Sequence, residues 1–167
     1  MLDAQALIGK HRGKGVIVDS NLLVLLLVGS VNTSRILNCK RTGDFTIADF
    51  NLLRNLITWF GKVFSTPHVL SQVSDLAEIN GDEQRILRHL FRLVVDEVEE
   101  HYESSRELVA DPIFVALGLA DSAIANVACS GILALTADVT LQLALQRRGA
   151  GALNFNHVRQ LAWNGSA

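Results

Sequence analysis

Short, mainly apolar segments alternate with helical patterns along this chain. Four such segments are predicted to be β-strands, at residues 15–18, 62–65, 132–135 and 152–155. Short continuous apolar runs are typical of strands that are buried on both faces. Because parallel strands need a long crossover between them, usually a helix, strands that alternate with helices form a mostly parallel sheet. The pattern therefore predicts an α/β fold with three layers, in which helices cover both faces of a central sheet.

The segments between the strands carry helix signals. After Thr46, Phe50, Leu53, Ile57 and Phe60 repeat with the spacing of one helical face. We expect helices at 22–28 (ending at Gly29), from 46, from 66, at 82–95, from 111 with a break at 117–119, at 121–131, at 139–148 and at 158–163. The continuation of the helix at 82–95 through residues 98–107 is ambiguous from the sequence.

Length and composition limit the architecture further. The chain has 167 residues, which suits one domain with a substantial core, so we expect a single domain over residues 1–167. Hydrophobic residues make up 49% and charged residues only 19%, which argues against disorder and favours a buried self-association surface, that of a homodimer. The formal net charge is −2, so any nucleic acid must be bound by a local cluster of basic residues.

The expected compartment is the cytoplasm. Cys39 and Cys129 are far apart and lack metal-ligand spacing, so they are expected to be reduced thiols. Residues 1–15 lack the apolar core of a signal peptide. The apolar run at residues 22–28 is too short to span a bilayer, so no membrane association is expected.

Three aspartates are expected at one edge of the sheet. Asp19 directly follows the first predicted strand, Asp138 follows the third, and Asp121 begins a helix after a tight turn. In open parallel sheets, ligands bind outside the carboxyl ends of the strands. Carboxylates gathered there repel one another unless a cation lies between them, and Mg²⁺ and Mn²⁺ prefer such oxygen ligands. The sequence therefore predicts a divalent metal site.

A simpler interpretation competes with the metal site. All three aspartates are predicted to stand just before a helix, and aspartate is a preferred N-cap residue. Taken singly, each is better explained as a cap than as a ligand. Serine, threonine and asparagine cap equally well, however, so aspartate at all three positions favours a site.

Four segments resemble the motifs of PIN-domain nucleases, in the same order and with similar spacing. They are residues 16–23 (VIVDSNLL), 66–74 (TPHVLSQVS), 117–124 (LGLADSAI) and 135–141 (LTADVTL). The resemblance covers about residues 15–160. It implies a compact fold around a mostly parallel sheet and the activity of a Mg²⁺- or Mn²⁺-dependent endoribonuclease.

The resemblance also implies roles for single residues and for partners. Asp19, Asp121 and Asp138 match the acidic residues of the family, and Asn21 and Thr136 match polar groups that orient carboxylates or water. The substrate implied is RNA. Many small PIN domains are toxins that a small antitoxin protein blocks, although this chain is longer than such toxins usually are. An RNA-processing or host-defence role is therefore equally open.

One departure from the family puts the activity in doubt. Where the second motif usually carries glutamate, this chain has Gln72, which adds no negative charge and is a poor base. Asp75 lies three residues on and shares its helical face, so it is a candidate substitute. The alternative to a weakened nuclease is a catalytically reduced PIN-like module that binds RNA or protein. A receiver-like phosphoacceptor role for Asp19 is disfavoured, because the accompanying acidic residues and lysine are missing.

Overall fold

The structure is a computed structural model that describes the backbone of residues 4–164 and the side chains of residues 4–162. Its five strands form one sheet in the order β3-β2-β1-β4-β5, and every neighbouring pair is parallel. The prediction of an α/β fold with a parallel central sheet is confirmed. The strands are β1 (Val16–Val18), β2 (Val63–Ser65), β3 (Glu99–Glu100), β4 (Leu133–Thr136) and β5 (Ala152–Asn154).

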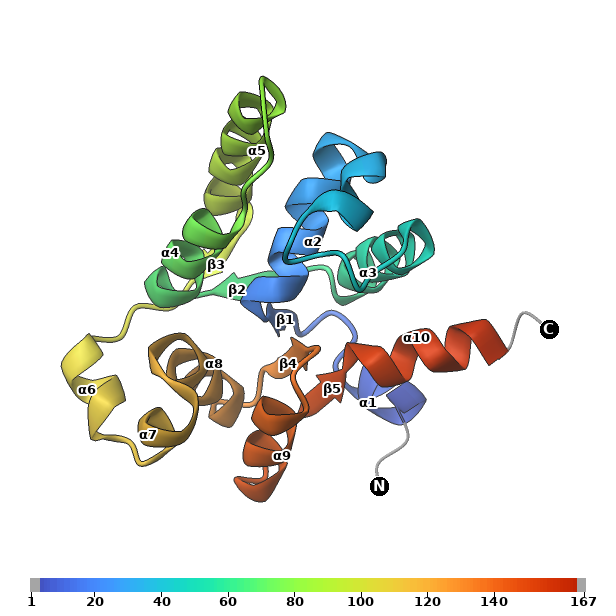
Figure 1. Cartoon of the computed structure of the whole chain (residues 1–167). Coiled ribbons are helices and arrows are strands. Elements are labelled where there is room, and N and C mark those ends of the chain that lie inside the picture. The colour runs from blue at the N-terminus through green and yellow to red at the C-terminus, as the bar shows by residue number, and fades with distance from the viewer. Residues whose placement is uncertain (1–3, 165–167) are drawn as a thin grey trace.

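Helices cover both faces of the sheet, which gives the three expected layers (Figure 1). One layer holds α2 (Ser20–Val31), α3 (Ile47–Phe60), α4 (Pro67–Leu76) and α5 (Glu83–Glu97). The other holds α6 (Ser105–Ala110), α7 (Ile113–Leu117), α8 (Leu119–Cys129) and α9 (Val139–Arg147). The helices α1 (Ala4–Lys10) and α10 (Phe155–Asn164) lie near β5, and the 3₁₀ helix η1 (Thr33–Asn38) follows α2.

The hydrophobic core follows from this layering. The residues of β1 are fully buried, and those of β4 are buried too, because each of these strands lies between two others and under helices on both faces. Helix α2 is buried along most of its length, with seven of its apolar side chains in the core. The apolar strands and helices predicted from the sequence are therefore the centre of the molecule.

The predicted helix starts are well reproduced. Thr46 caps α3 by accepting a hydrogen bond from the backbone N–H of Asp49, whose carboxylate accepts one from the Thr46 N–H in return. Gly61 ends that helix in the left-handed conformation, with φ of 77°. Thr66 caps α4, and Pro67 occupies its first turn as predicted.

The prediction that Gly29 ends the second-layer helix is wrong. Helix α2 continues to Val31, and Asn32 is its C-cap. Gly29 serves packing instead, because a Cβ added there would lie 2.7 Å from Cε2 of Phe50 on α3. The missing side chain lets the two helices approach closely, a requirement that a local pattern does not reveal.

Other differences concern the ends of the chain and the edge of the sheet. Helix α1 has no predicted counterpart. The ambiguous segment after α5 contains β3, a two-residue edge strand of exposed glutamates, followed by α6. The last strand ends at Asn154, and α10 begins at once at Phe155, three residues earlier than expected.

Among the helices described, none combines the length and the apolar character that crossing a membrane requires.

Candidate functional site

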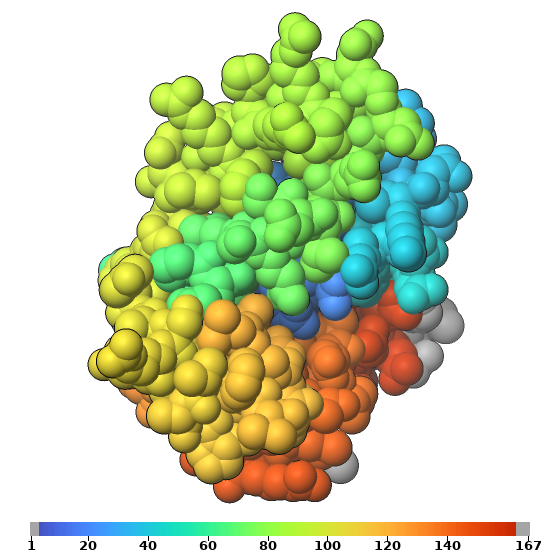
Figure 2. All heavy atoms as spheres, turned by 60° about the vertical axis from the view of Figure 1, so that its left-hand side comes forward, coloured from blue at the N-terminus to red at the C-terminus, as the bar shows by residue number. Residues whose placement is uncertain are grey.

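The strand order identifies the place where a ligand site is expected. The chain leaves β1 toward β2 and β3 on one side, then returns to build β4 and β5 on the other. The crevice outside the carboxyl ends of β1 and β4 is therefore the topological switch point of the sheet, where ligands bind in open α/β sheets. In Figure 2, blue atoms from the N-terminal part of the chain are visible in a recess between green helix α4 and the orange segments.

A row of polar residues crosses the sheet at this edge. Val18 is paired with Leu135, so the residues that follow, Asp19 and Thr136, lie at the same level. Thr136 is in turn paired with Asn154 of β5. All three are almost fully buried, which is unusual for polar residues unless they bond to one another or to a ligand.

Asp19 is held by three donors. Its Oδ2 accepts a 2.5 Å hydrogen bond from the hydroxyl of Thr136, and its Oδ1 accepts a 3.0 Å bond from the backbone N–H of Asn21. The backbone N–H of Ala137 is a further donor. Burial nevertheless raises the pKa of Asp19 above its ordinary value, because only 5% of the residue is exposed.

Asp138 is exposed and lies at the start of α9. Its Oδ1 accepts hydrogen bonds from the backbone N–H groups of Thr140 and Leu141, at 2.6 and 3.3 Å. Its own backbone N–H donates to the hydroxyl of Thr136 at 2.9 Å. One threonine hydroxyl thus connects the carboxylate of Asp19 with the backbone of Asp138, and the Oδ2 of Asp138 makes no hydrogen bond within residues 4–162.

Asp121 completes the group, although its position differs from the prediction. It does not precede its helix: Gly118 is the N-cap of α8, and Asp121 lies inside the first turn. Burial, and then the charges of Asp19 and Asp138, raises the pKa of the Asp121 carboxyl to about 7. Because Asp121 makes no hydrogen bond to the described residues, capping does not explain it.

The three carboxyl groups are neighbours, but they do not form a closed metal cage. Asp19 and Asp138 are close enough to Asp121 to raise its pKa. Among residues 4–162, however, no three His, Cys, Asp or Glu side chains converge closely enough to form a metal-binding group. The oxygen donors suit Mg²⁺ or Mn²⁺ chemically, and a cation there would relieve their mutual repulsion.

Gln72 lies beside this group. Its Oε1 accepts a short hydrogen bond from the hydroxyl of Ser20, the residue that follows Asp19. The side-chain amide therefore turns its acceptor toward Ser20, and its N–H donors remain without a partner among the described residues. Asp75 is exposed on the same helix and joins the group by no described hydrogen bond or ion pair.

The polar support on the β5 side was not anticipated. Asn156 donates from its side chain to the carbonyl oxygen of Ala137 at 2.9 Å, which fixes the loop before Asp138. Its backbone N–H donates to Asn154, whose amide donates to Gln142 at 3.0 Å. The Asn-Phe-Asn sequence after the last strand was the available signal. Asn21, a predicted orienting residue, contacts Asp19 through its backbone, with no described side-chain bond.

Comparison with known proteins adds no family to this description. No family model matches the chain, and no curated protein matches it. Fold and site define a class only by architecture: a parallel α/β protein with neighbouring carboxylates at its switch point.

Proposed function

We propose that this protein is a PIN-like, Mg²⁺- or Mn²⁺-dependent endoribonuclease whose metal ligands are Asp19, Asp121 and Asp138. The observation that carries the proposal is the convergence at the β1–β4 crevice of carboxylates that are 102 and 119 residues from Asp19 in sequence. Electrostatic crowding of this kind destabilises a protein unless a ligand repays it, so it is more typical of functional sites than of helix caps.

The chain's own residues would divide the work as follows. Thr136 and the N–H of Asn21 hold the Asp19 carboxylate in one orientation, and the N–H groups of α9 hold Asp138. Gln72 offers amide donors that suit a phosphate oxygen of the RNA backbone. A bound divalent cation supplies Lewis acidity toward water and phosphoryl oxygens and neutralises the carboxylates.

A second candidate function is a catalytically reduced module that binds RNA or protein without cutting. Two observations favour it: Gln72 replaces the acidic residue of the second motif, and no ready-made cage of three ligands is present within residues 4–162. In this alternative, the buried carboxyl of Asp19 holds a proton and serves as a structural hydrogen-bonding group.

Partners and setting follow from the nuclease proposal. The substrate is RNA in the cytoplasm, and a small antitoxin-like protein is a candidate inhibitor that covers the acidic crevice. The homodimer remains a prediction at this point, because the composition that suggested it identifies no surface.

Metal-dependent cleavage separates the two candidates. Purified protein is incubated with structured and single-stranded RNA in Mg²⁺, Mn²⁺ or EDTA, beside the variants Asp19→Asn and Asp138→Asn. The nuclease cuts RNA only with metal, and both variants lose the activity. If the wild type and both variants bind RNA equally and none cuts it, the binding module is the correct function.

The matched control is Asp44→Asn. Asp44 is an exposed aspartate in a turn, and its carboxylate makes no described hydrogen bond. The control therefore removes one negative charge without touching the crevice, and it should cut RNA at the wild-type rate.

A further inference from the structure

Helix α5 exposes an apolar stripe that the rest of the chain does not cover. Ile86 and Leu93 are 52% and 58% exposed, and Leu90 lies between them on the same helical face. Large apolar side chains that are exposed together mark an interaction surface more often than scattered single ones do. Figure 2 shows the helix along the top of the molecule, with its side chains extending into solvent.

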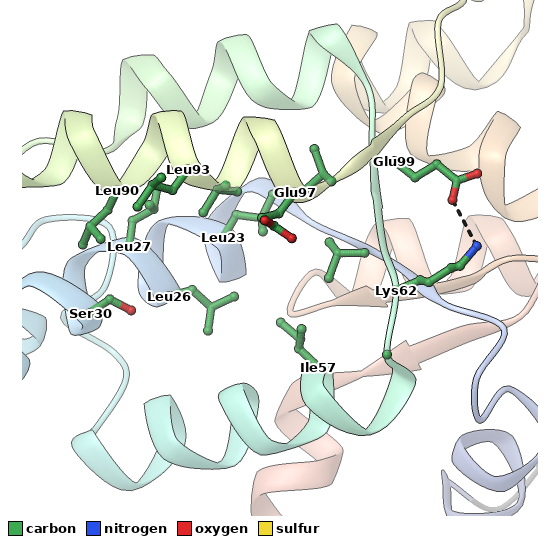
Figure 3. Close-up of a pocket in the computed structure, with 14 residues that line it drawn as sticks. Leu23, Leu26, Leu27, Ser30, Ile57, Lys62, Leu90, Leu93, Glu97 and Glu99 are labelled. Atoms are coloured by element: carbon green, nitrogen blue, oxygen red, sulfur yellow. Dashed lines mark hydrogen bonds and ion pairs between the residues drawn. The ribbon is translucent and has the colours of Figure 1, made fainter.

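An apolar groove lies next to this stripe. It encloses about 560 Å³ between α2, α3 and α5, and its walls include Leu23, Leu27, Ile57 and Leu93. Figure 3 shows the leucines of α2 facing Leu90 and Leu93 of α5 across it. The groove widens the apolar surface beyond a single helix, so a partner could bury more than one side chain there.

The charges of α5 are divided along its length. The first two thirds carry Arg85, Arg88, His89 and Arg92, and all four are exposed. The end carries Asp96 and Glu97, and exposed Glu99 and Glu100 follow in β3. Apart from Glu99, which pairs with Lys62 at 3.4 Å, none of these residues forms an ion pair within the described chain.

We propose that α5 is the interface of a twofold-symmetric homodimer, in which the helices of two copies pair antiparallel across their exposed stripes. In a twofold interface, residue i of one copy meets residue j of the other and the reverse. A helix with one basic and one acidic end is therefore complementary to itself only when antiparallel. Pairing centred near residue 91 places Arg85 opposite Glu97 of the second copy and His89 opposite its Leu93.

The division of labour in this interface follows from energetics. Burial of Ile86, Leu90 and Leu93 supplies most of the affinity, at about 25 cal/mol for each Å² of apolar surface removed from water. Exposed ion pairs contribute little each, but they select the antiparallel orientation and reject a parallel one. This surface accounts for the apolar excess of the sequence and leaves the carboxyl edge of the sheet open.

Charge-reversal variants test the interface by mixing. Arg85→Glu with Arg92→Glu makes the stripe acidic from end to end, and Asp96→Arg with Glu97→Arg makes it basic. Each double variant alone should be monomeric in sedimentation velocity, because its copies repel each other. An equimolar mixture should form a 1:1 dimer, which unfolded variants could not do, and wild type should dimerise alone.

The control and the contrary results are equally defined. Lys40→Glu with Arg41→Glu reverses two exposed charges in the turn before α3 and should leave the wild-type dimer intact. Wild type that stays monomeric over a concentration series overturns the proposal and leaves the groove to a different partner. Variants that remain dimeric alone, or that fail to combine on mixing, overturn it as well.

Discussion

The hydroxyl of Thr136 at the end of β4 donates a 2.5 Å hydrogen bond to the carboxylate of Asp19, which follows β1 and lies 117 residues away. The bond connects the two strands that border the switch point, and both residues are buried. It also fixes the carboxylate that the proposed function needs.

The first prediction concerns this hydrogen bond. Thr136→Val preserves the shape of the side chain but leaves a buried carboxylate oxygen without its donor, which should cost about 1–3 kcal/mol of unfolding free energy. Thr136→Ser keeps the hydroxyl and should lose clearly less. Urea unfolding measures both, and equal losses in the two variants would show that the hydroxyl contributes nothing.

The second prediction is a pH dependence of stability in metal-free protein. The pKa of Asp121 is raised to about 7 in the folded state, whereas the unfolded carboxyl titrates near 3.8. The folded state therefore binds the proton more tightly, so this contribution is complete below about pH 4 and is lost as the pH rises through 7. Asp121→Asn should flatten the decline of thermal stability between pH 5 and 8 in EDTA. An unchanged profile contradicts the crowding of carboxylates.

The third prediction concerns Gln72. Gln72→Glu would place a fourth carboxylate beside Ser20 and Asp19 and should raise the metal-dependent cleavage rate by about tenfold, or 1.4 kcal/mol. Gln72→Ala, which removes the amide without adding charge, serves as the control and should not raise the rate. A glutamate variant no faster than wild type would mean that Gln72 does not limit the site.

The fourth prediction concerns the contact between α2 and α3. Gly29→Ala should destabilise the protein by about 1–3 kcal/mol, since the added methyl group meets the ring of Phe50 in a packed core. Ser30→Ala on the exposed side of the same helix is the control, and its effect should stay within about 0.5 kcal/mol. Chemical denaturation compares the two, and similar values would remove the packing explanation for Gly29.

The strands that the sequence predicted are those whose residues are buried on both faces. The runs at β1 and β4 are continuous and apolar, so their burial could be predicted without coordinates. The edge strand β3 consists of Glu99 and Glu100, and its pairing depends on β2 alone, so no local signal reveals it. Gly29 was misjudged because its role depends on a residue of another helix.

The candidate site was predictable to a similar degree. The placement of Asp19 and Asp138 at the sheet edge followed from parallel topology. The hydrogen bond between Ser20 and Gln72 and the one between Asn156 and Ala137 did not, because both connect segments whose spatial relation depends on the complete fold. Asp121 was expected as a cap and lies within a helix, where its carboxyl faces charge.

Metal binding tests the central claim most directly. Electron paramagnetic resonance counts free Mn²⁺ as it is titrated into wild-type protein and into Asp19→Asn, Asp121→Asn and the control Asp44→Asn. The account predicts that wild type and the control bind Mn²⁺ and that both crevice variants lose most of the affinity. Equal binding in all four proteins, or none in wild type, would contradict a shared cation at the carboxyl ends of β1 and β4.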